Sequence, residues 1–263
     1  MLMAPVHKTE VVPLASGGGI PLVGFGTWEL QGDDAYNGVL AALEIGYRHI
    51  DTATGYANED RVGAAVRDSG LDRGNVFITT KCPPELAGRE LETLERSLAL
   101  LGTEFVDLWL VHWPPDGKAR PATWEQFIVA QQQGKARAIG VSNYSIGQVD
   151  ELIEATGQAP AVNQIPWSPF SYDPTTAGAL AERGTVLEGY SPLKRSSLDH
   201  PVLLGIGRAH GKTPAQVILR WHVQHRYVVI PRSARRARIE ENFGLFDFEL
   251  TEEEIARVDA LAP

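Results

Sequence analysis

Four side chains in the sequence could carry out acid–base chemistry on one oxygen atom: Asp51, Tyr56, Lys81 and His112. The apolar runs YRHID, VFITTK and VDLWLVH each end in one of them, and Tyr56 follows Asp51 by five residues. Asp and Lys are almost never buried unless they are paired, so packing alone explains these run ends poorly. A phenol has an ordinary pKa of about 10 and donates a proton poorly near neutral pH. A neighbouring ammonium lowers that pKa, so we expect Lys81 to activate Tyr56.

The remaining two side chains fit the same chemistry. Asp51 would hold the Lys81 ammonium in place, and His112 would give a second hydrogen bond to the substrate oxygen. A positioned phenol is a general acid for an oxygen that gains negative charge, as a carbonyl oxygen does during reduction. The competing interpretation is structural, with an ion pair, a core tyrosine and a hydrogen-bonded histidine, because such networks also occur without function.

Eight apolar runs of strand type would position these residues, and each is followed by a segment of helical periodicity. The runs are LVGFGTW, YRHID, VFITTK, FVDLWLVH, ARAIGVS, AVNQI, TVLEGY and YVVIPRS. The repeat predicts a closed parallel (β/α)8 TIM barrel, with residues 1–263 as one domain. Active sites of such barrels lie at the carboxyl ends of the strands, where all four side chains would meet.

Two other features bear on the architecture. The segment KTEVVPLASGGGIPLVG predicts a hairpin with a glycine turn that closes the barrel floor. The alternative is an open doubly wound sheet, which would carry a G-x-G-x-x-G motif if it bound a dinucleotide. The stretch GFGTWE lacks the third glycine. The sequence therefore favours the barrel.

Composition excludes several classes of partner. The chain has 263 residues, 43% of them hydrophobic, and a net charge of −9, which argues against nucleic-acid binding. No apolar run approaches the roughly 18 residues of a membrane span, and MLMAPVHKTEVV lacks a secretory signal. Cys82 is the single cysteine, and Asp51 with His112 offers too few ligands for a metal. We therefore expect a cytoplasmic protein without a metal, membrane or nucleic-acid partner.

Nine motifs resemble one family, in order and over nearly the whole chain. They are GFGTW, RHIDTATGYANEDRVG, FITTK, VDLWLVHWP, AIGVSNY, VNQI, GYSPL, GKTPAQVILRW and IPRSARRARIEEN. They resemble the aldo-keto reductase superfamily, and most of all its compact bacterial members of the diketogluconate-reductase type. The resemblance implies NADPH-dependent reduction of a small carbonyl compound by a monomer. The catalytic tetrad would be Asp51, Tyr56, Lys81 and His112, with Tyr56 as the proton donor.

The resemblance also implies residues that bind the cofactor. The nicotinamide carboxamide would contact Ser142, Asn143 and Gln164, and the nicotinamide ring would stack on Tyr190. The pyrophosphate would lie at Ser191 and Leu193, and the adenosine part would contact Arg232, Ser233, Arg238, Glu241 and Asn242. We expect Trp28 and Trp113 as aromatic walls of the substrate pocket.

The segment RSARRAR places four arginines within seven residues, directly after the last strand run. It predicts a site for the 2′-phosphate that distinguishes NADPH from NADH, because guanidinium forks and helix N-terminal amides both bind phosphate. The alternative is a solvated basic face.

Some positions depart from the family pattern. Arg232 stands where lysine is common, which replaces a point charge by a planar fork. Pro166 stands where an acid is common, and no tryptophan follows Lys81 closely. The chain stops at Pro263, so we expect no long loop over the pocket, and hence broad specificity for small aldehydes, α-keto carbonyls and diketones. Two other functions stay open: a Schiff-base enzyme that uses Lys81, and an NADPH-binding regulatory or sensor module.

Overall fold

The computed structural model describes residues 7–8 and 10–262. Residues 1–6 of the stretch inspected for a secretory signal, Thr9 of the expected hairpin segment, and Pro263 lie outside the described residues. Within the described part of the chain, no helix is both long enough and apolar enough to cross a membrane.

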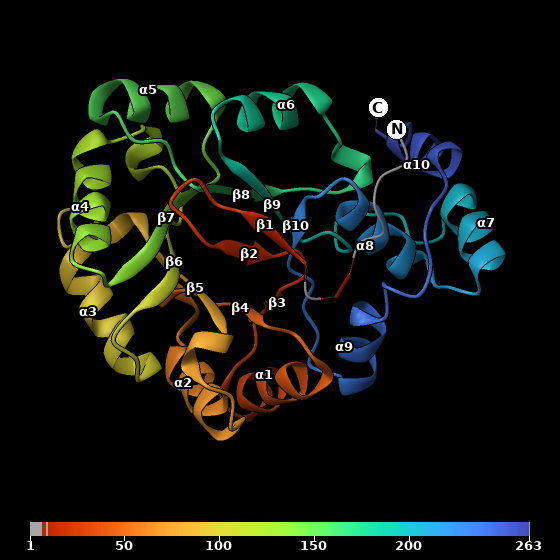
Figure 1. The fold of residues 1–263 in the computed structure, drawn as a ribbon, viewed down its shortest axis with the longest axis horizontal. Coiled ribbons are helices and arrows are strands. Elements are labelled where there is room, and N and C mark those ends of the chain that lie inside the picture. Colours follow the sequence, from red (N-terminus) through yellow and green to blue (C-terminus); the bar gives the residue numbers. More distant parts are fainter. Residues whose placement is uncertain (1–6, 9, 263) are drawn as a thin grey trace.

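Eight parallel strands curl into a barrel, which confirms the predicted architecture (Figure 1). In chain order they are β3 (Phe25–Gly26), β4 (His49–Asp51), β5 (Phe77–Cys82), β6 (Val106–Val111), β7 (Ala136–Ser142), β8 (Val162–Pro166), β9 (Val186–Tyr190) and β10 (Val228–Val229). Each strand pairs with the next one along the chain. A parallel bridge between Val23 and Val229 joins the first strand region to the last, and Gly24 N donates to Val229 O at 2.9 Å.

Helices surround the barrel, as Figure 1 shows. They are α1 (Gly32–Ile45), α2 (Glu59–Asp68), α3 (Glu90–Leu101), α4 (Pro121–Gln132), α5 (Ile146–Thr156), α6 (Pro174–Glu182), α7 (Pro201–His210), α8 (Pro214–Gln224), α9 (Arg236–Phe243) and α10 (Glu252–Asp259). Helices α3 and α5 each end at a glycine, Gly102 and Gly157, which have φ values of 66° and 73°. Glycine adopts this left-handed conformation without a steric penalty.

The strands are buried on both faces, which explains their continuous apolar runs. In β6, Trp109 points outward and stacks on Phe127 of α4 with ring centroids 3.6 Å apart. Its neighbours Leu108 and Leu110 belong to the cluster inside the barrel. Packing therefore takes up the strand from Leu108 to Val111, and His112 is the first polar side chain after Asp107.

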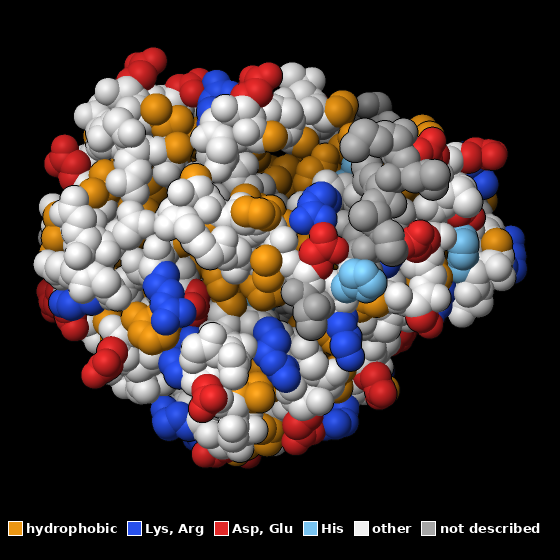
Figure 2. All heavy atoms as spheres, viewed as in Figure 1, with side chains coloured by type: hydrophobic (Ala, Val, Ile, Leu, Met, Phe, Trp, Pro, Cys, Tyr) orange, Lys and Arg blue, Asp and Glu red, His pale blue; other side chains and the backbone are white. Residues whose placement is uncertain are grey.

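The N-terminal hairpin is present as predicted. Its strands are β1 (Val11–Pro13) and β2 (Gly19–Pro21), which pair antiparallel with Val12 opposite Ile20. Leu14 and Ile20 pack into the apolar cluster that includes Leu108 and Val162. Figure 1 shows the hairpin across the middle of the ring of strands, and Figure 2 shows positive and negative side chains interspersed over this face. The hairpin therefore fills the end of the barrel interior away from the carboxyl ends of the strands, where Asp51, Lys81 and His112 lie.

Candidate active site

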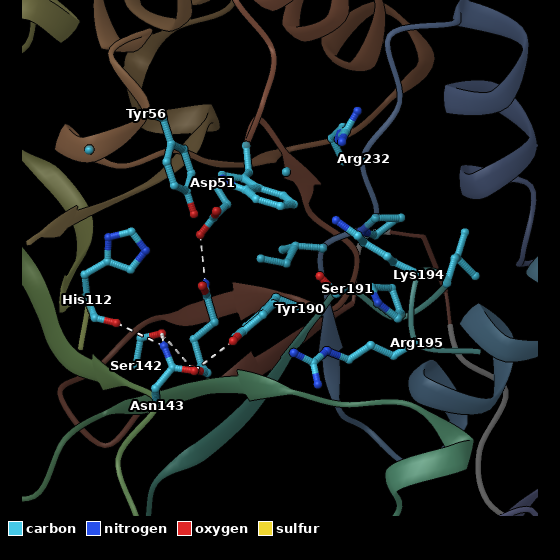
Figure 3. Close-up of a pocket in the computed structure, with 18 of the residues that line it drawn as sticks. Asp51, Tyr56, His112, Ser142, Asn143, Tyr190, Ser191, Lys194, Arg195 and Arg232 are labelled. Atoms are coloured by element: carbon cyan, nitrogen blue, oxygen red, sulfur yellow. Dashed lines mark hydrogen bonds between the residues drawn. The ribbon is translucent and has the colours of Figure 1, made fainter. Parts of the chain in front are cut away.

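The four acid–base side chains lie together at the carboxyl ends of neighbouring strands. Asp51 ends β4, Lys81 is the penultimate residue of β5, and His112 directly follows β6. Tyr56 ends a short 3-10 helix, η1 (Thr54–Tyr56), in the loop after β4. Figure 3 shows Asp51, Tyr56 and His112 around one pocket.

Asn58 holds the loop that presents Tyr56, a role that the sequence analysis did not assign. Its Nδ2 donates to Thr27 O at 3.0 Å and to Leu30 O at 2.8 Å, and its Oδ1 accepts from Thr52 Oγ1 at 2.7 Å. Asn58 is fully buried, so these bonds satisfy the amide completely and tie the loop to the end of β3. In the sequence, this role is indicated only by the polar cluster Asn58, Glu59 and Asp60, which follows Tyr56 closely.

Lys81 forms a buried ion pair with Asp51. The distance from Lys81 Nζ to Asp51 Oδ1 is 2.7 Å, and Nζ also donates to Thr52 O at 2.8 Å. Burial acts to lower the pKa of Lys81, but Asp51, Tyr56 and Glu188 act in the opposite direction and leave that pKa above its ordinary value. Lys81 is therefore an ammonium throughout the neutral range.

The pKa of Tyr56 lies above its ordinary value, contrary to the expectation from the sequence. Lys81 Nζ lies 3.3 Å from Tyr56 Oη and lowers its pKa, but burial raises that pKa by more, and Asp51 adds to the rise. The expectation that Lys81 brings the pKa of Tyr56 below its ordinary value is thus wrong. The phenol therefore keeps its proton at neutral pH, and this protonated form is the one that can act as a proton donor.

His112 is a neutral imidazole next to that phenol. Its ring meets the Tyr56 ring edge to face, with centroids 5.6 Å apart. Burial and the charge of Lys81 lower the pKa of His112 to about 3. Among the described residues, the two ring nitrogens have no hydrogen-bond partner, so one N–H can point to a ligand.

A second group of polar side chains ties the ends of β6, β7 and β9 together beside the tetrad. Tyr190 Oη donates to Asn143 Oδ1 at 2.8 Å, and Asn143 Nδ2 donates to Ser142 Oγ at 3.0 Å and to His112 O at 3.1 Å. Asn143 has a φ of 65°, a left-handed conformation that asparagine tolerates better than most residues. These bonds fix the Tyr190 ring against the cavity (Figure 3).

Gln164 connects this group to the tetrad. Its Nε2 donates to Asp51 Oδ2 at 2.8 Å and to Glu188 Oε2 at 3.0 Å. Both amide protons are thus engaged by carboxyl groups, and the amide oxygen of Gln164 stays available as an acceptor in the cavity that the residue lines.

The cavity above these residues has a volume of about 790 Å³, within the range of small-molecule sites. Most expected site residues line it: Trp28, Asp51, Tyr56, His112, Trp113, Ser142, Asn143, Gln164, Tyr190, Ser191, Leu193 and Arg232. Lys81 does not line the cavity, but its Nζ contacts the hydroxyl of Tyr56, which does. Lys194 and Arg195 line it without having been expected, although two adjacent basic residues after GYSPL were a visible signal. Lys194 Nζ lies 4.6 Å from the centroid of the Trp28 ring.

The arginine cluster is divided by the fold. Arg232 lines the cavity and pairs with Glu29, whereas Arg236 pairs with Glu44 of α1 at 2.5 Å. Arg238 is exposed on α9 and has no ion-pair partner among the described residues. Four residues expected near the adenosine part do not line the cavity: Ser233, Arg238, Glu241 and Asn242. Ser233 Oγ accepts from Arg235 N at 3.0 Å, and Glu241 accepts from Thr213 Oγ1 at 2.7 Å.

Known proteins resemble the chain in sequence and in fold. The family model "Aldo/keto reductase family" matches residues 22–263. The chain is 40% identical over 261 residues to glyoxal reductase of Bacillus subtilis, and the alignment covers 98% of this chain and 94% of that protein. It is 41% identical over 250 residues to 9,11-endoperoxide prostaglandin H2 reductase of Trypanosoma cruzi, which covers 92% and 88% of the two chains.

A crystal structure of an aldo/keto reductase from Brucella melitensis superimposes with a TM-score of 0.94 at 38% identity, covering 98% of this chain and 100% of that one. The matching model spans the barrel, the tetrad positions and the arginine cluster together. The chain therefore belongs to the aldo/keto reductase family of NAD(P)H-dependent oxidoreductases.

Proposed function

We propose that this protein reduces small aldehydes and ketones to alcohols with NADPH, and that Tyr56 supplies the proton. One observation carries the assignment of Tyr56: its protonated hydroxyl lies at the cavity, 3.3 Å from the charged Lys81 and beside the neutral ring of His112. In this arrangement a proton donor, a cation and a neutral N–H converge on one point.

The residues act on the carbonyl oxygen. The bound cofactor supplies the hydride that the carbonyl carbon receives. As negative charge grows on the oxygen, Tyr56 Oη transfers its proton there and the His112 ring donates a hydrogen bond. Tyr56 is left as a phenolate, which the Lys81 ammonium stabilises, and Asp51 holds that ammonium in place. The O–H bond of Tyr56 breaks, and the O–H bond of the alcohol forms.

The side chains along the cavity fit a nicotinamide dinucleotide. The oxygen of the Gln164 amide is an acceptor that matches a carboxamide N–H, and Ser142 and Asn143 lie beside it. The Tyr190 ring, fixed through its hydroxyl, offers a face for stacking. Ser191 and Leu193 would hold the pyrophosphate.

The far end of the cofactor would lie at Arg232, Ser233, Arg238, Glu241 and Asn242. Arg232 supports this placement because it lines the cavity. Its ion pair with Glu29 must exchange for one with a phosphate, which reduces the gain in binding from this arginine. Arg238 has no such competitor among the described residues and is the stronger candidate for selecting the 2′-phosphate.

The pocket would accept a broad range of carbonyl compounds. Trp28 and Trp113 are 43% and 49% exposed, so the aromatic walls stand in an open site. The two curated relatives are named for substrates of very different size, glyoxal and prostaglandin H2. The motif resemblance to diketogluconate reductases adds diketones to the candidates. We further propose that residues 1–263 form one domain, because the barrel closes between Val23 and Val229, near opposite ends of the chain. The motif resemblance implies that this domain acts as a monomer.

The alternative role for Lys81, a Schiff base with substrate, requires a neutral amine. The ion pair with Asp51 keeps Lys81 charged, and the Lys81 side chain is fully buried. Both observations argue against that role. Borohydride should therefore trap no substrate on Lys81.

The decisive experiment follows NADPH absorbance with a panel of aldehydes, α-keto carbonyls and diketones, for wild type and Tyr56→Phe. We expect turnover by wild type and a loss of ~10²–10⁴-fold or more in Tyr56→Phe, with cofactor binding retained because the ring remains. Tight NADPH binding without turnover of any carbonyl would instead support a regulatory module.

A further inference from the structure

Glu188 is a buried carboxyl beneath the site, and the proton transfer described above does not use it. It lies in the middle of β9 with no exposed surface. Its Oε2 accepts from Gln164 Nε2 at 3.0 Å, and the same nitrogen donates to Asp51 Oδ2 at 2.8 Å. A single amide therefore connects Glu188 to the carboxylate that holds Lys81.

The other carboxyl oxygen of Glu188 has no hydrogen-bond partner among the described residues. His49 Nε2 lies 3.6 Å from this oxygen, and that nitrogen already lies 3.0 Å from Thr79 Oγ1. Burial and Lys81 lower the pKa of His49 to about 3, so the ring is neutral and offers no counter-charge. A buried polar atom without a partner is costly, and here it belongs to a group that can change its charge.

The charges that face Glu188 favour its protonated form. Asp51 and His49 face it from β4, and Lys81 faces it from β5. Lys81 and Asp51 already neutralise each other, so an ionised Glu188 would leave one buried negative charge without a cation of its own. Burial and the charge of Asp51 raise the pKa of Glu188 to about 8, against the opposing effects of Gln164 and Lys81.

We propose that Glu188 is a positioning residue of the reductase: it anchors Gln164, and by binding or releasing a proton it sets the net charge beside Asp51, Lys81 and Tyr56. The inference rests on the proposed role of Tyr56 as proton donor. With Glu188 neutral, the charge of Lys81 acts mainly on Asp51 and Tyr56. With Glu188 ionised, the added negative charge opposes formation of the Tyr56 phenolate, and proton transfer to the substrate slows.

The first measurement is the pH profile of kcat for carbonyl reduction at saturating NADPH, in wild type and in Glu188→Gln. The amide has nearly the same shape, can still accept from Gln164, and cannot ionise. In wild type we expect kcat to fall on the order of tenfold between pH 6.5 and pH 9, because one buried charge beyond hydrogen-bond range acts on a second charge with about this effect at an effective dielectric constant of ~20. In Glu188→Gln this fall should be absent.

The second measurement needs no catalysis. The pKa of Glu188 is raised in the folded protein, so its proton stabilises the fold fully below the ordinary carboxyl range, and this stabilisation is lost as the pH rises towards about 8. The ratio of the unfolding equilibrium constants of wild type and Glu188→Gln, from urea titrations, should therefore change about tenfold per pH unit between pH 5 and pH 8. This result holds whether or not Tyr56 is the proton donor.

Glu59 offers a matched control. It is also a buried glutamate with a raised pKa, and the charges of Arg96 and Lys81 also act on it, but its hydrogen-bond partners are Thr80 and Ser97, and it has no bond to Gln164 or Asp51. Glu59→Gln should change the pH dependence of stability and leave the slope of kcat against pH as in wild type. If Glu188→Gln does not fold, Glu188→Met gives a second side chain of similar length that cannot ionise.

The outcomes separate the two proposals. A kcat slope that persists in Glu188→Gln, or one that Glu59→Gln removes equally, overturns the positioning role of Glu188. A stability ratio that does not vary with pH overturns the raised pKa on which the role depends. Retained activity in Tyr56→Phe would refute the proton donor alone, and the urea titrations would still report on Glu188.

Discussion

Replacing Lys81 by methionine should affect activity and stability by separable amounts. Lys81 Nζ lies 2.7 Å from Asp51 Oδ1, and both side chains are buried, with 0% and 3% of their surface exposed. Lys81→Met leaves the Asp51 carboxylate buried without its cation, and losing one partner of a buried pair typically costs about 3–5 kcal/mol. The variant should therefore unfold at a clearly lower urea concentration.

The effect on catalysis follows from the second contact of Lys81. A phenolate on Tyr56 would lie 3.3 Å from the ammonium. At an effective dielectric constant of ~20, that attraction is about 5 kcal/mol, and each 1.4 kcal/mol corresponds to a factor of ten. Lys81→Met should thus lower kcat by roughly three to four decades.

A double variant separates the two effects. Asp51→Asn combined with Lys81→Met removes both charges, so most of the lost stability should return while kcat stays low. Urea titration, NADPH absorbance and NADPH fluorescence titration measure stability, turnover and an intact cofactor site in the same preparations. A double variant with kcat within tenfold of wild type would refute the role of the ammonium.

Three further predictions concern the cofactor, the substrate and His112. Arg238→Ala should weaken NADPH binding by roughly one to two decades, since a hydrogen bond to a charged group contributes about 1.5–3 kcal/mol, and NADH binding should hardly change. Arg236→Ala is the control, because Arg236 is paired with Glu44. Equal losses of affinity for both cofactors in Arg238→Ala would contradict the 2′-phosphate site. Small aldehydes, α-keto carbonyls and diketones should all be reduced with modest affinity, and a low-micromolar KM for one substrate with no activity on the others would argue for a closed pocket. Because the pKa of His112 is about 3, the ring stays neutral from pH 5 to pH 7, and a His112-dependent inflection of kcat near pH 6.5 would show that the imidazole is charged in the working enzyme.

The fold could be predicted because each strand obeys a local rule. A strand buried on both faces is mostly apolar until it emerges, so runs such as VFITTK and VDLWLVH mark both the strand and the end where Lys81 and His112 lie. The same rule brought Asp51, Lys81 and His112 to one rim. The glycine turn of the hairpin followed from backbone sterics alone.

The electrostatics could not be predicted in the same way. The pKa of Tyr56 is decided by competition between burial and a cation 3.3 Å away, and sequence gives neither the burial nor the distance. Glu188 could have been found, because a glutamate inside the apolar strand TVLEGY contradicts packing as strongly as a lysine at a strand end. A charged residue at a strand end signals a site more plainly than one inside the strand, and Glu188 lies two residues before the end of β9.

The barrel interior is filled unequally, and this asymmetry determines where changes can be tolerated. On β6, the inward residues Leu108 and Leu110 pack with Leu14 of the hairpin region in an apolar cluster. On β4, β5, β8 and β9, the inward residues form a buried polar chain: Lys81, Asp51, Gln164 and Glu188. An apolar cluster accommodates a change of shape by local repacking, whereas a buried polar chain must satisfy every member. Replacing a charged member of these four residues, such as Glu188, will therefore change the charge balance at Tyr56, although the Glu188 side chain does not line the cavity.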